Sequence, residues 1–151
     1  MILEEIELAI VRYFKEQKHI IIPNFYLEHE CDLIVIRPTR YAIEVEIKRT
    51  VADMKNDLKK SHNHVSEFIV ELYYAFPENI AEKCIPLVPE HAGIFIIKPN
   101  RVKASLFRKA KRNPKAVRWT NREVKKVLRY SVYRVWGMKR KFVKLLKSKK
   151  S

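Results

Sequence analysis

Residues 31–48, CDLIVIRPTRYAIEVEIK, decide the fold expected for this chain. Asp32 opens an apolar run, residues 33–36, that is typical of a buried strand, and Pro38 lies in the turn that ends it. Residues 41–48 have the composition of a second strand that returns beside the first. The stretch is therefore predicted to form a β-hairpin.

The second strand of this hairpin carries charged residues on one side only. Because side chains alternate between the two faces of a strand, Glu44, Glu46 and Lys48 share one face and the aliphatic residues between them share the other. Burying such charges in a sheet is costly unless a metal ion or mutual pairing compensates them. The alternative is a solvated strand face with cross-strand ion pairs.

The rest of the chain alternates between helix and strand patterns, which predicts an α/β fold with a central mixed sheet flanked by helices. Pro23 interrupts a strand-like stretch and favours a sheet edge. Thr50 and Asp53 form a capping-box variant that opens a helix. The predicted helices are residues 2–17, 50–62, 78–84 and a long one from 121, and the predicted strands are 19–27, 32–36, 41–48, 67–76 and 93–97.

Positive charge is concentrated at the C-terminal end. The net charge is +15, but residues 1–97 contain 11 Lys and Arg against 16 Asp and Glu, whereas residues 98–151 contain 21 against a single Glu123. This change predicts a core, residues 1–100, and a basic extension, residues 101–151, with a long amphipathic helix. Such an extension indicates a partner with regularly spaced negative charge, foremost nucleic acid. A solvated tail and an anionic membrane surface are weaker interpretations.

The cysteines and the N-terminus point to a cytoplasmic protein with no membrane partner. Cys31 and Cys84 have no CxxC spacing, which favours free thiols in a reducing compartment. The first residues, MILEEIELAI, are acidic where a signal peptide is basic, and no apolar run reaches membrane-spanning length. The histidines and cysteines also lack the spacing of zinc sites, so zinc is not expected.

Asp32, Glu46 and Lys48 together have the chemistry that phosphodiester hydrolysis requires. Carboxylate oxygens suit Mg²⁺ or Mn²⁺, which polarises a phosphate and makes an attacking water more acidic. Asp32 and Glu46 are predicted to be the metal ligands. Lys48 is predicted to orient or help deprotonate the water and to stabilise the transition state. Glu44, on the same face, is a candidate outer ligand.

These residues resemble the core motif of the PD-(D/E)xK nucleases, which have a restriction-endonuclease-like fold. The motif places an Asp at the start of one strand and E-x-K on the next, matched here by Asp32 and by residues 46–48, with Cys31 where the motif has Pro. The resemblance implies that the carbonyl of Ile47 joins the metal shell. It also implies that a glutamate of the preceding helix, for which we take Glu5, completes the site.

A longer stretch is similar to the MmcB-like DNA repair nucleases. Their run E-x-K-x-[ST]-x-x-D-x-x-x-D-x-K is matched from Glu46 to Lys59, and strands like residues 74–77 and 93–94 follow. The likeness covers residues 1–100 and implies that Asp53, Asp57 and Lys59 frame the rim of the active site. Lys60 is expected at a polar helix end or against DNA.

Together these patterns predict a divalent-metal-dependent DNA endonuclease that acts in repair, recombination or restriction. Two alternatives stay open: a catalytically inactive DNA-binding module on the same fold, and a structural nucleoprotein factor whose acidic strand pairs with its own basic tail. Cleavage of both strands of a duplex would favour a homodimer. The predicted phosphate contacts in the basic extension are Arg108, Lys109, Lys111, Arg112 and Arg118.

Overall fold

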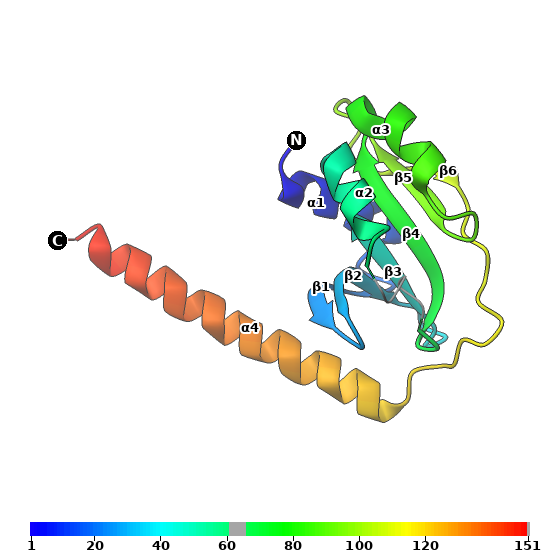
Figure 1. Cartoon of the computed structure of the whole chain (residues 1–151). Helices are drawn as coiled ribbons and strands as arrows, with labels where there is room; N and C mark the ends of the chain where they lie inside the picture. Colours follow the sequence, from blue (N-terminus) through cyan, green and yellow to red (C-terminus); the bar gives the residue numbers. More distant parts are fainter. Residues whose placement is uncertain (61–65, 151) are drawn as a thin grey trace. The chain divides into compact units, whose positions relative to one another are not determined.

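The predicted hairpin lies inside a six-stranded mixed sheet in the computed structural model, which describes residues 1–60 and 66–150 (Figure 1). The strands follow one another across the sheet in chain order. Their bounds are β1 (Ile20–Tyr26), β2 (Glu30–Ile36), β3 (Ala42–Ile47), β4 (Ile69–Pro77), β5 (Gly93–Ile97) and β6 (Ser105–Arg108). The α/β class with a central mixed sheet is therefore confirmed.

The strand directions follow from the connections between them. β1, β2 and β3 are antiparallel neighbours joined by short turns, and Pro23 lies in the edge strand β1, as predicted. β3, β4 and β5 are parallel because helices cross over between them. These helices are α2 (Val51–Asp57) and α3 (Glu78–Cys84), the second followed by the short 3₁₀ turn η1 (Ile85–Leu87).

Each face of the sheet is covered by a different set of helices. The opening helix α1 (Leu3–Phe14) packs Ile6 and Ile10 into the same apolar cluster as Val45 and Ile47 of β3. On the other face Met54 of α2 and residues of α3 pack against β4 and β5. Glu44 and Glu46 alternate with the residues that face α1, so their carboxylates lie on the side of α2.

The structure differs from the sequence prediction in the extent of several elements, and α1 ends at Phe14 instead of residue 17. α2 ends at Asp57 instead of near residue 62, and residues 61–65 lie outside the described part of the chain. Residues 105–108, whose conformation the sequence does not predict, pair with β5 as β6. The first compact unit consequently runs to Arg118 and not to residue 100, because the sheet takes in part of the basic extension.

The second unit, Trp119–Ser151, is built on the long helix α4 (Asn121–Ser148). Its start is fixed by the predicted capping box: the Thr120 side chain accepts from the Arg122 backbone, and the Glu123 carboxylate accepts from the Thr120 N–H at 2.7 Å. Most of its apolar side chains are exposed, Leu128 and Phe142 each by 62%. In the described part of the chain, no helix is long and apolar enough to span a membrane.

Candidate metal-dependent active site

Asp32 and Glu46 come together because β2 and β3 are paired in antiparallel register. Leu33 lies opposite Val45 and Ile34 opposite Glu44, so the same register places Asp32 beside Glu46. The Asp32 Oδ2 accepts a 2.7 Å hydrogen bond from the backbone N–H of Ile47. The hairpin therefore fixes both carboxylates at one end of the two strands.

Lys48 lies between two buried carboxylates. Its Nζ donates to Glu46 Oε2 at 2.9 Å and to Asp57 Oδ1 at 2.8 Å, and its side chain is only 7% exposed. Burial alone would lower the pKa of Lys48, but Glu46 and Asp57 outweigh it and hold that pKa above the usual value. Lys48 is therefore an ammonium ion in this arrangement.

Asp57 is held in place by several donors from different elements. Besides Lys48, Asp57 Oδ1 pairs with Lys60 Nζ at 3.1 Å, and Asp57 Oδ2 accepts from the Tyr74 hydroxyl at 2.8 Å. Tyr74 reaches it because the parallel pairing of β3 with β4 sets Tyr74 beside Glu46. Asp57 therefore connects α2 to the two central strands and positions the Lys48 ammonium.

These groups border one depression of about 310 Å³ at the ends of β2 and β3. Its lining contains most of the predicted site, including Asp32, Glu46 and Lys48. The complete lining is Glu30, Asp32, Glu46, Ile47, Lys48, Asp53, Asn56, Asp57 and Lys60. Glu30, Asn56 and the neighbouring Tyr74 are absent from the sequence prediction.

Other predicted residues lie elsewhere. Glu5 is exposed, accepts a 2.9 Å hydrogen bond from the Ile2 N–H, and belongs to the helix on the opposite face of the sheet. The prediction that Glu5 belongs to the active site is therefore wrong, because α1 packs against the aliphatic side of β3. Glu44 is fully buried, but its Oε1 lies 2.7 Å from His29 Nε2 and it does not line the depression.

The rim carboxylate Asp53 has a structural task as well. Its Oδ2 accepts from the Thr50 N–H at 3.1 Å and its own N–H donates to Thr50 Oγ1 at 3.0 Å, which completes the capping box of α2. Lys59 is exposed at the turn after α2 and is not part of the lining. Asp53 therefore borders the depression, and Lys59 lies outside it.

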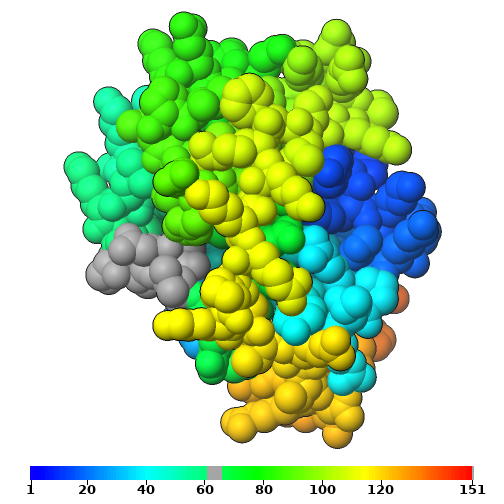
Figure 2. All heavy atoms as spheres, turned by 90° about the vertical axis from the view of Figure 1, so that its right-hand side faces the viewer, coloured from blue at the N-terminus to red at the C-terminus, as the bar shows by residue number. Residues whose placement is uncertain are grey.

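Some of the cations in residues 108–118 that are predicted to contact phosphate instead contact other parts of the first unit. This segment crosses the surface of the first unit as an extended ridge (Figure 2). The Arg108 guanidinium donates to the carbonyls of Val88, Pro89 and Ala92 at 2.8 to 3.4 Å, which corrects its assignment as a free phosphate ligand. The other four cations, Lys109, Lys111, Arg112 and Arg118, are exposed. Lys111 pairs with Glu90 at 3.0 Å. The guanidinium groups of Arg112 and Arg118 lie over the ring of Tyr41.

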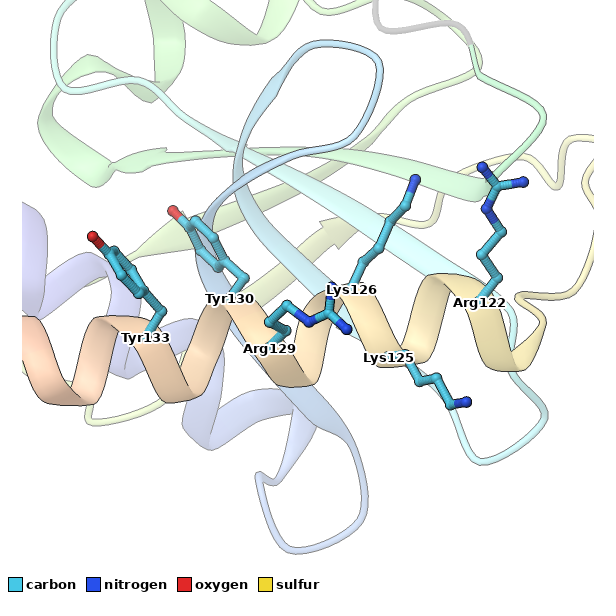
Figure 3. A pocket seen from close by; sticks show the side chains of 6 residues that line it. All are labelled: Arg122, Lys125, Lys126, Arg129, Tyr130 and Tyr133. Atoms are coloured by element: carbon cyan, nitrogen blue, oxygen red, sulfur yellow. The ribbon is translucent and has the colours of Figure 1, made fainter.

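A second group of cations gathers on α4. Arg122, Lys126, Arg129 and Tyr133 follow one another at three- and four-residue steps, so they share one side of the helix. Figure 3 shows these side chains projecting from successive turns, with Tyr130 among them. The six residues of this basic aromatic surface are Arg122, Lys125, Lys126, Arg129, Tyr130 and Tyr133.

The donor set of the depression suits a hard divalent cation. Asp32 and Glu46 both border the depression and offer carboxylate oxygens to it. Mg²⁺ commonly binds through one or two carboxylates, with substrate phosphate and water filling the other positions. Asp32, Glu46 and the Ile47 carbonyl could therefore hold Mg²⁺ or Mn²⁺ together with a phosphate.

Replacing Asp32 by asparagine is expected to raise the melting temperature of the metal-free protein at neutral pH. Burial raises the pKa of Asp32, although the Ile47 N–H and Lys48 oppose the shift. Because the pKa of Asp32 is higher in the folded than in the unfolded protein, Asp32 contributes to stability when the pH is below its ordinary pKa. This contribution is lost as the pH rises through the pKa that Asp32 has in the folded protein. Asparagine removes that charge and keeps an acceptor for Ile47.

The pH dependence of melting checks this prediction. In the presence of a chelator, the gap in Tm between Asp32→Asn and the wild type should be largest at neutral pH and shrink as the pH approaches 4. A gap that stays constant over this range would show that the charge of Asp32 is not its cause.

No protein-family model matches the sequence, and no curated protein matches it significantly. Among solved structures the chain is similar to SPO1766, a protein of unknown function from Silicibacter pomeroyi. The TM-score is 0.67 and the sequence identity 15%, over 91% of this chain and 88% of that chain. The two proteins therefore share a fold, and at this identity the likeness extends to nothing more.

Proposed function

We propose that this protein is a divalent-metal-dependent deoxyribonuclease that hydrolyses phosphodiester bonds at the depression bordered by Asp32, Glu46 and Lys48. The observation that supports it most is the juxtaposition of two carboxylates from adjacent strands with a buried ammonium ion. The resemblance to PD-(D/E)xK nucleases rests on the same three residues. DNA repair, recombination or restriction is the proposed setting.

The residues of the chain have separable tasks in this proposal. A divalent cation held by Asp32 and Glu46 would polarise the scissile phosphate and increase the acidity of the attacking water. The Lys48 ammonium is placed to donate a hydrogen bond to the water or to a phosphate oxygen as negative charge develops.

The basic aromatic surface of α4 is proposed to hold the DNA backbone. α4 contains ten Lys and Arg and one Glu, so its charge matches a polyanion along 28 residues. Tyrosines among the cations could stack against exposed bases. The exposed cations Lys109, Lys111, Arg112 and Arg118 of the first unit, with Lys59 and Lys60 beside α2, are proposed as further phosphate contacts.

One observation favours the alternative of a catalytically inactive DNA-binding module. Lys48 already pairs with Glu46 and Asp57, so part of the buried charge is balanced without a cation. Such a module would bind DNA through the same basic surfaces. It would not cut DNA under any metal condition.

A nuclease assay on the purified 151-residue chain separates the two functions. Single-stranded, duplex, flapped and branched DNA are incubated with Mg²⁺ or Mn²⁺, and with a chelator as control. We expect that the protein cleaves at least one of these substrates and that this cleavage requires the metal. Tight binding without cleavage of any substrate would favour the inactive module, and neither binding nor cleavage would reject both functions.

A further inference from the structure

Three buried side chains of metal-binding type converge beside the proposed active site. His29 is 7% exposed, and Cys31 and Glu44 are fully buried. One ligand atom from each, the imidazole nitrogen, the thiol sulfur and a carboxylate oxygen, lie within 4.8 Å of one another. His29 precedes β2, Cys31 lies within β2 and Glu44 within β3, so the cluster joins two strands. This group of three is the His29 cluster.

The ligand atoms of the His29 cluster need only small movements to supply three of the four ligands of a zinc ion. Zn–S bonds of about 2.3 Å and Zn–N and Zn–O bonds of about 2.0–2.2 Å place tetrahedral donors roughly 3.3–3.7 Å apart. His29 Nε2 and Glu44 Oε1 are now 2.7 Å apart, so these two atoms would separate slightly on binding the ion. Side-chain rotation can supply changes of this size without moving the strands.

The charge balance and softness of the donors select a transition metal. A thiolate and a carboxylate together neutralise a dication, which makes the buried site neutral overall. Sulfur and imidazole favour Zn²⁺ over Mg²⁺, in contrast to the oxygen donors of Asp32 and Glu46. The two neighbouring sites would therefore take different metals.

We propose that His29, Cys31 and Glu44 form a zinc-binding site distinct from the depression at Asp32 and Glu46. The sequence analysis does not expect zinc, because the histidines and cysteines lack the spacing of zinc sites. The cluster instead arises from a His-x-Cys segment and a residue of the paired strand. A zinc ion there would tie the residues just before Asp32 to the strand that carries Glu46, and the proposal does not depend on nuclease activity.

Cobalt substitution in the 151-residue chain tests this proposal. Protein purified with a chelator and a reductant is titrated with Co²⁺, and we expect one equivalent to produce a sulfur-to-cobalt charge-transfer absorption that Zn²⁺ abolishes. Cys31→Ser should lose this absorption, and His29→Gln and Glu44→Gln should weaken Co²⁺ binding at least tenfold. Circular dichroism establishes that each variant is folded.

The chain offers two matched controls. Cys84→Ser replaces the other buried free cysteine, which lies outside the cluster, and should keep the absorption. Asp32→Asn combined with Glu46→Gln should also keep it, which separates this site from the proposed active site. No charge-transfer absorption in the wild type would overturn the proposal whatever the variants do. An absorption that persists in Cys31→Ser, or disappears in Cys84→Ser, would overturn it too.

Discussion

Replacing Asp32 by alanine is expected to reduce DNA cleavage by about 1,000-fold or more, with DNA affinity unchanged. Asp32 is one of two carboxylates proposed to hold the cation, and metal stabilisation of transition-state charge is worth several kcal/mol, where each ~1.4 kcal/mol is about tenfold in rate. Glu46→Ala should have an effect of the same order. Lys48→Ala should lower the rate of DNA cleavage by about 100- to 1,000-fold, as the loss of other preorganised hydrogen-bond donors does.

A neighbouring carboxylate provides the control for this series. Asp53 also borders the depression, but it is exposed and caps α2 through Thr50. Asp53→Ala removes the N3 side chain of the capping box and should reduce cleavage far less than Asp32→Ala. Single-turnover rates and fluorescence anisotropy of labelled DNA measure the two quantities. Equal cleavage by wild type and Asp32→Ala would reject the assignment of the site.

Neutralising the basic aromatic surface is expected to weaken DNA binding and flatten its dependence on salt. Each cation that neutralises a phosphate contributes about 0.9 to the slope of log affinity against log salt. Exchanging four cations for glutamine should therefore lower that slope by about 3 to 4 if all of them contact phosphates. The exchanged residues are Arg122, Lys125, Lys126 and Arg129.

A charge-matched variant on the first unit controls for net charge. It exchanges four exposed lysines on or near α1, α2 and α3, namely Lys15, Lys18, Lys55 and Lys83, for glutamine. Glutamine preserves helix propensity, so both variants should stay folded. The same loss of slope in both would show that overall charge, and not α4, governs binding. Deleting residues 101–151 is a poorer test because it removes β6 from the sheet.

The hairpin and its charged face could be predicted because both depend on local pattern. The alternation of side chains along a strand places Glu44, Glu46 and Lys48 on one face. The short turn between β2 and β3 leaves few registers in which the two strands can pair. The register that forms brings Asp32 to Glu46. The capping boxes at Thr50 and Thr120 likewise depend on residues three positions apart, and both are present.

The contacts that complete the site depend on distant parts of the chain. Tyr74 reaches Asp57 only through the parallel register of β3 and β4, which a crossover of more than 20 residues sets. No spacing in the sequence reveals that register. The strand alternation does place Glu30 on the same side as Asp32, so this lining residue could have been predicted.

Long-range packing also explains the wrong predictions. Glu5 could be assigned to the site only by assuming which face of the sheet α1 covers, and α1 covers the aliphatic face of β3. Arg108 resembles a solvated cation in a basic run, but three carbonyls of the loop before β5 accept from its guanidinium. β6 is only four residues long and lies in this basic run, so its pattern is too short to predict a strand.

Binding of Mn²⁺ to the wild type and to Asp32→Asn combined with Glu46→Gln tests the central claim most directly. Electron paramagnetic resonance counts the bound ions, and competition with Mg²⁺ identifies a site with oxygen ligands. We predict one Mn²⁺ that Mg²⁺ displaces from the wild type, and loss of this site in the folded double variant. Equal, Mg²⁺-sensitive binding by both proteins would contradict a metal site built on Asp32 and Glu46.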